Sequence, residues 1–350
     1  MTTPAIAVIG AGYWGPNLIR NLQAHPAWDL RWVCDLDAER AGRVVGNAPG
    51  VRITTDLNDV LDDPDVIAVA VATPAATHTA VVMACLEAGR HVLVEKPLAP
   101  SLAEGRKLVQ LADDRDLVLM CDHTYCYTPA VLKIRDLVAG GDLGDIQYFD
   151  SVRVNLGLIQ SDIDVLWDLG PHDLSILDFI LPVDMRPRRV AAHGADPVGA
   201  GHLCVGYLTL PLNETAVAHI HLNWLSPVKV RTTLIGGSRR MVVWDDLNPA
   251  QRISVYDRGV DVQTGSTGDA RRQAHVAYRL GDMVAPALPE TEALQGVVGE
   301  FAAAIDEHRA PLTDGRAGLR VLELLEAAGR SLELGGGFVD IGEEASWTAS

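Results

Sequence analysis

With 350 residues, the chain is too long for one ordinary domain and predicts two, since domains average roughly 150 residues. A hydrophobic fraction of 48% with 21% charged residues is typical of a soluble globular protein, and no apolar run approaches the about 18 residues that suggest a membrane span. The formal net charge of −17 argues against nucleic acid and membranes as partners, but a local basic patch still allows an anionic small substrate.

The cysteines and the amino terminus indicate a cytoplasmic protein. The five cysteines form no CxxC pair and no metal-finger spacing, so we expect free thiols in a reducing compartment and no metal site. The first ten residues, MTTPAIAVIG, lack a basic region ahead of their apolar segment, which we therefore interpret as a strand and not as a signal peptide.

The first element is an apolar strand, AIAVIG (5–10), that enters the glycine motif Gly10-Ala-Gly12-Tyr13-Trp14-Gly15 ahead of a helix. In a dinucleotide-binding motif the first glycine makes the tight turn, the second lets the backbone approach a pyrophosphate, and the third allows close packing of helix on strand. The orphan N–H groups of the helix then hold the phosphates. Strand, glycines and helix together make this motif specific.

The second strand, LRWVC (30–34), ends at Asp35, twenty residues past Gly15. A carboxylate there accepts hydrogen bonds from a ribose diol and repels a 2′-phosphate, which favours NAD over NADP. A solvated turn carboxylate is the alternative, and Asp37 is the rival if the register shifts by two residues.

The βα alternation continues through strands at 51–54 and 66–71. Thr73 and Pro74 follow the second of these and are expected to border the dinucleotide cleft. His78 begins the next helix, where contact with the cofactor and packing on a neighbour are equal alternatives.

The segment HVLVEKP (91–97) is a buried strand followed by Glu95, Lys96 and Pro97. Open α/β sheets bind ligands at the carboxyl ends of their strands, so a lysine there is placed to donate to a substrate oxygen. A surface lysine is the alternative. A helix from Ser101 to about Asp114 and a strand at 117–121 complete a doubly wound Rossmann domain, residues 1–122, with six strands.

Beyond residue 122 the alternation stops, and residues 123–350 are predicted to form an α+β domain. A helix is expected at about 129–139. The strands that follow alternate apolar and polar residues, which predicts a large open, mostly antiparallel sheet with one face exposed to solvent. The uncovered face of this sheet suggests a homo-oligomer, a dimer or tetramer. The strands are expected near residues 146–156, 189–193, 203–210, 215–224, 229–236, 240–245 and 252–257. A polar loop (263–273) and two helices, at about 291–308 and 315–333, follow.

A second chemical motif, DVLWDLGPHDLSILDFIL (164–181), lies in this domain. Asp168 and His172 are four residues apart and share one face of a helix, which tolerates Pro171 in its first turn. A histidine works as general acid or base near neutral pH, and a nearby carboxylate raises its basicity. An ordinary aspartate and a satisfied core histidine are the alternative.

Six segments together resemble the Gfo/Idh/MocA sugar and cyclitol oxidoreductases, and the resemblance covers nearly the whole chain. The segments are GAGYWG (10–15), ATPAATH (72–78), EKPL (95–98), WDLGPHD (167–173), YRLGDM (278–283) and GEF (299–301). The resemblance implies NAD as cofactor, bound near Tyr13, Trp14, Thr73, Pro74, His78 and the Glu95-Lys96-Pro97 segment. It implies that His172 removes the hydroxyl proton, Lys96 hydrogen-bonds the reacting oxygen, and Asp168 supports the pair. An Arg-Tyr pair common in the family is replaced here by a segment with Tyr125 and Tyr127.

Within the family, GYWGPN and the segment 218–231 most resemble the branch acting on nucleotide-linked sugars such as UDP-N-acetyl-glucosaminuronate, oxidised at C3. Guanidinium groups suit diphosphates and carboxylates, so we expect a substrate anion near Arg153, Asn155, Lys229 and Arg231, with Tyr125 also in the substrate site. Exposed sheet positions are the alternative for Lys229 and Arg231. Other readings are an inositol or free-sugar dehydrogenase, a 3-ketosugar reductase, and an NAD-sensing regulatory protein on the same scaffold.

Overall fold

The computed structural model describes residues 3–160, 163–263 and 275–342. The chain divides into two compact units, residues 1–128 with 290–326 (unit 1) and residues 129–289 with 327–350 (unit 2). The first boundary lies six residues beyond the predicted one, and residues 290–326, which the sequence placed in the second domain, belong to unit 1. The predicted loop at 263–273 lies outside the described residues except for residue 263.

Unit 1 contains a six-stranded parallel sheet in the order β3-β2-β1-β4-β5-β6, which confirms the predicted doubly wound sheet. Its central strands are buried on both faces, as their unbroken apolar sequences require. The strands are β1 (Ala5–Ile9), β2 (Asp29–Cys34), β3 (Arg52–Thr54), β4 (Val66–Val71), β5 (His91–Glu95) and β6 (Leu119–Asp122).

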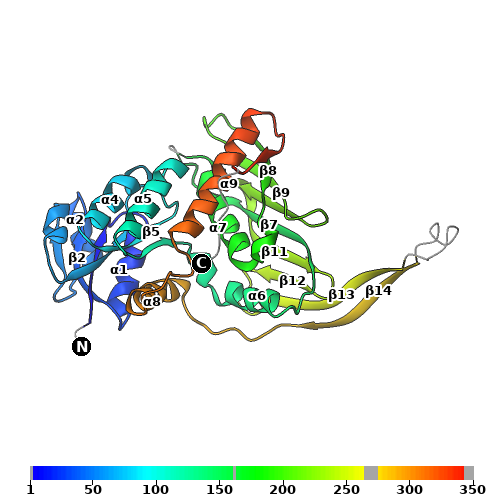
Figure 1. Cartoon of the computed structure of the whole chain (residues 1–350), viewed down its shortest axis with the longest axis horizontal. Helices are drawn as coiled ribbons and strands as arrows, with labels where there is room; N and C mark the ends of the chain where they lie inside the picture. Colours follow the sequence, from blue (N-terminus) through cyan, green and yellow to red (C-terminus); the bar gives the residue numbers. More distant parts are fainter. Residues whose placement is uncertain (1–2, 161–162, 264–274, 343–350) are drawn as a thin grey trace. The chain divides into compact units, whose positions relative to one another are not determined.

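Helices flank this sheet, and α4 and α5 lie side by side (Figure 1). The hydroxyl of Ser101 accepts from the Glu104 N–H at the start of α5, as the sequence predicts. The α-helices are α1 (Gly15–Ala24), α2 (Ala38–Val45), α3 (Leu57–Leu61), α4 (His78–Glu87), α5 (Leu102–Asp114) and α8 (Ala293–Asp306), with α9 (Gly315–Glu333) running from unit 1 into unit 2; η1 (Ala75–Thr77) and η2 (Thr124–Tyr127) are short 3₁₀ helices.

Helix α8 joins unit 1 because it packs against α1. The Trp28 indole donates to the Val298 carbonyl at 2.8 Å, and Arg20 forms an ion pair with Glu292 at 2.6 Å. These contacts span about 270 residues of chain and are not visible in local sequence patterns.

Unit 2 contains a nine-stranded sheet in the order β14-β13-β12-β11-β7-β10-β9-β8-β15, antiparallel except for the β7–β10 pair. The predicted open, mostly antiparallel sheet is therefore confirmed. Its strands are β7 (Ile146–Leu156), β8 (Arg189–Ala195), β9 (Val205–Pro211), β10 (Val217–Asn223), β11 (Leu225–Gly237), β12 (Met241–Asp245), β13 (Ile253–Gln263), β14 (His275–Val284) and β15 (Val339–Asp340).

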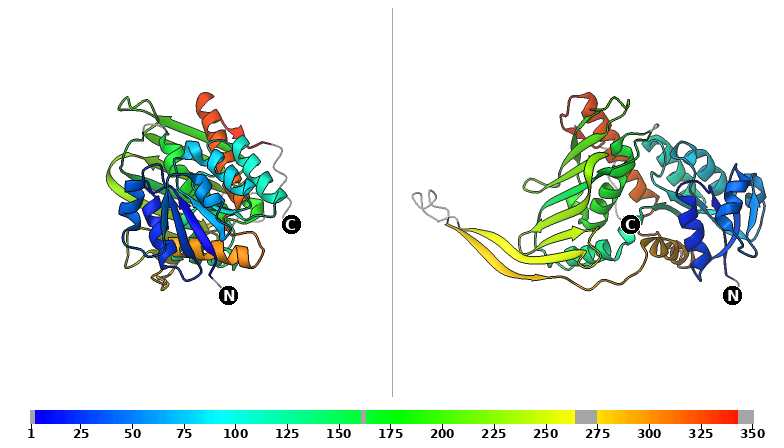
Figure 2. Two further views of the ribbon diagram at one scale, coloured as in Figure 1. Left: turned by 90° about the vertical axis from the view of Figure 1, so that its left-hand side faces the viewer. Right: turned by 180° about the vertical axis from the view of Figure 1, so that it is seen from behind.

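Helices α6 (Pro129–Ala139) and α7 (Val165–Ile180) pack together, α7 lies against β10, β9 and β7, and η3 (Val183–Met185) follows it. Side chains alternate across the strands: Leu208 and Leu210 of β9 are buried, whereas Tyr207 is 48% exposed on the other face. In the rear view of Figure 2 the strands of the unit 2 sheet, not the helices α6 and α7, face the viewer. Strands β13 and β14 extend away from the other strands of the sheet (Figures 1 and 2).

Among the helices that the structure describes, none combines the length and the apolar character needed to cross a membrane.

Candidate active site

The glycine turn after β1 fits a dinucleotide. Gly10 has φ 98°, and a Cβ there would lie 2.7 Å from the Ala72 carbonyl oxygen, while a Cβ on Gly15 would overlap the Gly10 carbonyl oxygen. A Cβ on Gly12 would meet no atom within 4 Å. The turn is thus closely packed at its first and third glycines and leaves open space beside the second, where a pyrophosphate approaches. No side chain caps the amino terminus of α1. Pro16 has no N–H and the Asn17 N–H donates to the Trp14 carbonyl at 2.9 Å, which leaves the Gly15 N–H of the first turn for a phosphate oxygen.

Asp35 follows β2 directly and is tied to the same turn. Its carboxylate accepts from the Ala11 N–H at 2.6 Å, the Asp37 N–H at 2.8 Å and the Arg40 guanidinium at 2.5 Å. Burial alone would raise the pKa of Asp35, but these donors outweigh it and hold the pKa below its usual value. Asp37, the rival candidate, instead accepts from the Arg40 N–H and caps α2.

His78 links the loop after β4 to the segment after β5. Its Nδ1 lies 2.8 Å from the Pro97 carbonyl oxygen and its Nε2 lies 2.9 Å from the Thr73 carbonyl oxygen. Burial lowers the pKa of His78, so its imidazole is neutral at pH 7 and donates to one of the two carbonyls. His78 thus packs between the segments that follow β4 and β5.

Lys96 follows the carboxyl end of β5, beside a buried pair of acids. Glu95 and Asp122 are opposite each other on β5 and β6 and are hydrogen-bonded through their side chains. Asp122 also accepts from the Trp14 indole at 3.1 Å and from the Thr124 hydroxyl at 2.7 Å. Burial, and then the neighbouring Asp122 carboxylate, raise the pKa of Glu95 well above its usual value, and burial also raises the pKa of Asp122. Their shared hydrogen bond raises the pKa of Glu95 and lowers that of Asp122, so Glu95 is the carboxyl that holds the proton more tightly.

Sequence reasoning missed Asp122 and Thr124. The position of Asp122 in the sequence was the available signal. Asp122 and Glu95 stand at the carboxyl ends of two consecutive parallel strands, and the carboxyl ends of parallel strands meet at one edge of the sheet. Trp14 was predicted near the cofactor, and its bond to Asp122 ties the glycine turn to β6. Tyr125 is half-buried in η2, next in the chain to Thr124.

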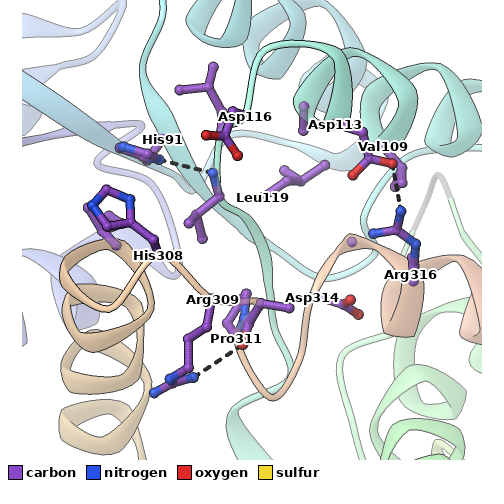
Figure 3. A pocket seen from close by; sticks show the side chains of 16 residues that line it. His91, Val109, Asp113, Asp116, Leu119, His308, Arg309, Pro311, Asp314 and Arg316 are labelled. Atoms are coloured by element: carbon purple, nitrogen blue, oxygen red, sulfur yellow. Dashed lines mark hydrogen bonds and ion pairs between the residues drawn. The ribbon is translucent and has the colours of Figure 1, made fainter. Parts of the chain in front are cut away.

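A cavity of about 440 Å³ opens at the other end of this sheet (Figure 3). It is lined by His91 and Leu119, which begin β5 and β6, and by His308, Arg309 and Arg316. Asp113 forms an ion pair with Arg316 there at 2.7 Å. Because the glycine turn and Lys96 lie at the carboxyl ends of the strands, this cavity is separate from the dinucleotide site.

In unit 2, Asp168 and His172 lie one turn apart on α7, both half-buried. Asp164 caps this helix by accepting from the Leu166 and Trp167 N–H groups at 2.9 and 3.0 Å. Gly206 of β9 allows the close approach, since a Cβ there would lie 2.5 Å from the Leu166 side chain.

The Trp224 indole donates to the Asp168 carboxylate at 3.1 Å. Trp224 is buried between β10 and β11, and its backbone carbonyl accepts from the Gly157 N–H at 2.8 Å. A Cβ on Gly157 would lie 2.9 Å from the Asn155 amide nitrogen and 3.2 Å from the Trp224 ring. The structure thus places the predicted residue Asp168 on the Trp224 indole, which the sequence did not single out.

The predicted anion ligands occupy different environments. Arg153 is buried and bound by Asp173, with Nε 2.6 Å from Oδ2 and Nη2 3.2 Å from Oδ1, so this arrangement does not support a role as an anion ligand. Arg231 lies 3.5 Å from Asp246 and is about one-third exposed, and Lys229 is exposed on β11.

The two halves of the predicted chemistry are each assembled within one unit. Unit 1 holds the glycine turn, Asp35 and Lys96 at one edge of its sheet, and unit 2 holds Asp168, His172 and Trp224. Among the described residues, no group of three or more His, Cys, Asp or Glu side chains is placed to hold a metal ion.

Comparison with known proteins identifies the family of the chain. Residues 5–123 match the sequence model of the oxidoreductase family with an NAD-binding Rossmann fold, Gfo/Idh/MocA. UDP-N-acetylglucosamine 3-dehydrogenase from Acidithiobacillus ferrooxidans is 30% identical over 319 residues, covering 90% of this chain and 93% of that protein. Inositol 2-dehydrogenase 2 from Paenarthrobacter aurescens is 44% identical over 148 residues, 40% of this chain and 43% of that protein.

Solved structures agree with these matches. That of the Acidithiobacillus ferrooxidans enzyme has a TM-score of 0.78 at 27% identity and covers 95% of this chain and 99% of that chain. GenD2 from gentamicin A biosynthesis, solved with NAD, has a TM-score of 0.80 at 26% identity over 98% of this chain and 97% of that chain. The chain belongs to the Gfo/Idh/MocA family of oxidoreductases, which carry an NAD-binding Rossmann domain.

Proposed function

We propose that this oxidoreductase uses NAD to oxidise a secondary hydroxyl, at C3, of a nucleotide-linked sugar or sugar acid. Two observations support the proposal: Lys96 follows the carboxyl end of β5 in unit 1, and Asp168 and His172 lie one turn apart on α7 in unit 2. The Acidithiobacillus ferrooxidans relative, named for this reaction on UDP-N-acetylglucosamine and aligned over 90% of the chain, supports the substrate class.

The catalytic roles follow from the chemistry of the three side chains. The His172 imidazole accepts the hydroxyl proton, since a neutral histidine is an effective base near pH 7. The Lys96 ammonium donates a hydrogen bond to the reacting oxygen and stabilises the negative charge that develops on it. Bound NAD supplies the acceptor for the hydride. Asp168, held by the Trp224 indole, supports the histidine and binds a neighbouring sugar hydroxyl.

The dinucleotide binds at the glycine turn. The open space beside Gly12 would receive the pyrophosphate, and Asp35 would bind the adenosine ribose. The negative charge of Asp35, maintained by its lowered pKa, disfavours a 2′-phosphate and makes NAD the preferred cofactor over NADP. Tyr13, Thr73, Pro74 and Pro97 border the same edge of the sheet.

The nucleotide part of the substrate meets unit 2. Lys229 and Arg231 lie on β11 with exposed or partly exposed cationic groups, which suit a diphosphate or carboxylate. Asn155 and Tyr125 complete the proposed substrate contacts. Arg153 is left out of this set, because its guanidinium is buried against Asp173.

A second candidate substrate is a free cyclitol. It is favoured by the 44% identity to an inositol 2-dehydrogenase over 148 residues. That match covers 40% of the chain, whereas the nucleotide-sugar enzyme aligns over 90%. We therefore place the cyclitol second.

The test is a turnover assay with NAD or NADP and a panel of UDP-N-acetylglucosamine, its uronate, myo-inositol and glucose, read at the absorbance band of reduced nicotinamide. We expect turnover of a UDP-sugar with NAD. Lys96→Ala and His172→Ala are each expected to lower kcat by roughly two to four decades, the usual size of these terms.

The control is Lys229→Ala, which is expected to raise KM for the UDP-sugar and leave kcat nearly unchanged. Turnover of inositol alone selects the second candidate. Tight NAD binding without turnover of any sugar contradicts the enzyme and selects a cofactor sensor, and near-normal rates in either catalytic variant contradict the assigned roles.

A further inference from the structure

A buried ion pair joins the central strand of the unit 2 sheet to the helix that carries His172. The Arg153 guanidinium of β7 donates twice to Asp173 of α7, from Nε at 2.6 Å and from Nη2 at 3.2 Å. The two side chains are 5% and 1% exposed. The Ser151 hydroxyl also donates to Asp173 at 2.6 Å and lies 3.2 Å from the Thr233 hydroxyl of β11.

Stability alone does not account for this pair. Desolvating two charges costs about as much as their attraction returns, and well-packed apolar residues at such positions often make a fold equally stable. The ion pair instead fixes the orientation of α7 relative to β7. A forked guanidinium–carboxylate contact is satisfied in one geometry, whereas apolar contacts tolerate rotation and sliding of the helix.

Helix α7 needs such a constraint next to His172. Pro171 lies in the interior of the helix, not in its first turn as the sequence suggested. It has no N–H, so the backbone hydrogen bond from position 171 to the Trp167 carbonyl cannot form. Asp173 is the second residue after this gap. Its anchor therefore acts where the helix is locally weakest.

The anchor also sets the direction of the imidazole. Successive residues in a helix point about 100° apart, so an Asp173 side chain fixed toward β7 determines the direction in which His172 leaves the helix. The Trp224–Asp168 bond at 3.1 Å fixes the same face one turn earlier. His172 is thus held from both sides along the helix.

We propose that Arg153 is a positioning residue, which clamps Asp173 and thereby orients the His172 imidazole. The inference rests on the proposed role of His172 and replaces the expectation that Arg153 binds a substrate anion. Arg153 does not touch the substrate; its effect passes through Asp173 and the helix backbone.

The test compares Arg153→Met, Arg153→Lys and the apolar double variant Arg153→Met/Asp173→Leu with the wild-type protein. The double variant removes both charges and is expected to fold with a near-wild-type melting temperature, which separates positioning from folding. We expect its kcat to fall about 10- to 100-fold, as small displacements of catalytic groups do, with NAD affinity unchanged and KM nearly unchanged. Arg153→Lys keeps one charge-assisted bond and is expected to recover part of kcat.

The matched control is Arg186→Met, which removes the ion pair to Asp178 (2.9 Å) at the far end of the same helix and is expected to leave kcat unchanged. A readout independent of turnover is the NMR titration of the His172 imidazole, assigned by its loss in His172→Ala. We expect the pKa of the His172 imidazole to differ from the wild-type value in the double variant and to equal it in Arg186→Met.

The outcomes separate the two proposals. Wild-type kcat and an unmoved His172 titration in a folded double variant overturn the positioning role. A raised KM for UDP-sugars with normal kcat shows that Arg153 binds the substrate anion and also overturns it. If the wild-type protein turns over no sugar, the proposed function fails, and the titration by itself then decides whether Arg153 orients His172.

Discussion

Gly12 and Gly15 share one turn, but a methyl group would meet a different environment at each. The turn was predicted from the spacing of its glycines, and the structure shows what each one does. Gly15 packs on the Gly10 carbonyl, whereas Gly12 faces open space. The third glycine therefore serves the fold and the second serves the ligand.

We expect Gly12→Ala to change the free energy of unfolding by no more than about 0.5 kcal/mol, as at other uncrowded positions. Its affinity for NAD is expected to fall about tenfold or more, because the methyl group occupies the approach of the pyrophosphate. Gly15→Ala is the matched comparison and is expected to cost roughly 1–3 kcal/mol or more through overpacking. Denaturant unfolding and NAD titration calorimetry measure both effects. Normal NAD affinity in Gly12→Ala would show that the dinucleotide binds elsewhere.

The strands and helices that bear the site residues were largely predictable. The parallel strands of unit 1 read as short apolar runs, and α7 was expected from the spacing of Asp168 and His172. The burial of Ser151 and Arg153 on β7, in phase with the buried Phe149, was not predicted from the sequence. Periodicity carries no information on their partner Asp173, twenty residues away on another element.

The β5–β6 acid pair leads to a prediction on pH. The pKa of Glu95 in the folded protein is raised above its ordinary value of 4.5, so between these two values the folded state binds more protons than the unfolded state. The stability that this group contributes is therefore complete below pH 4.5 and is lost as the pH rises toward the folded pKa, by up to roughly 1.4 kcal/mol per pH unit.

Glu95→Gln keeps a donor toward Asp122 and removes the titration. We expect the variant to gain stability relative to the wild-type protein as the pH rises from about 5 to about 9, and to lose that advantage at low pH. Urea unfolding across this range measures it. If the free energies of unfolding of the two proteins vary with pH in parallel, Glu95 is ionised in the folded state, and the prediction is wrong.

At the scale of the whole molecule, the open face of the nine-stranded sheet in unit 2 bears on assembly. Tyr207 is 48% exposed on this face and stacks on His221, with ring centroids 4.4 Å apart. An extended sheet face with exposed aromatic side chains favours association with a second copy. We propose that the protein is a homo-oligomer, a dimer or tetramer, through this face.

Light scattering after size-exclusion chromatography is expected to show an oligomer for the wild-type protein and a smaller species for Tyr207→Glu, because a buried unpaired carboxylate opposes the interface. Val183→Glu changes another exposed apolar residue, 61% exposed in η3 and off the sheet, and is expected to leave the mass unchanged. A wild-type monomer, or an unchanged mass in Tyr207→Glu, would contradict an interface on this face.

The sequence by itself determined the dinucleotide motif, the six-stranded parallel sheet, the open second sheet and the family, because glycine spacing, apolar runs and alternation are local patterns. Only the tertiary structure decided that residues 290–326 join unit 1, that Asp122 pairs with Glu95, that Trp224 holds Asp168 and that Arg153 is committed to Asp173. Each of these is a contact between residues far apart in the chain. Such a contact depends on how whole elements pack, and a buried charge finds its partner only once that packing has brought it within hydrogen-bond distance.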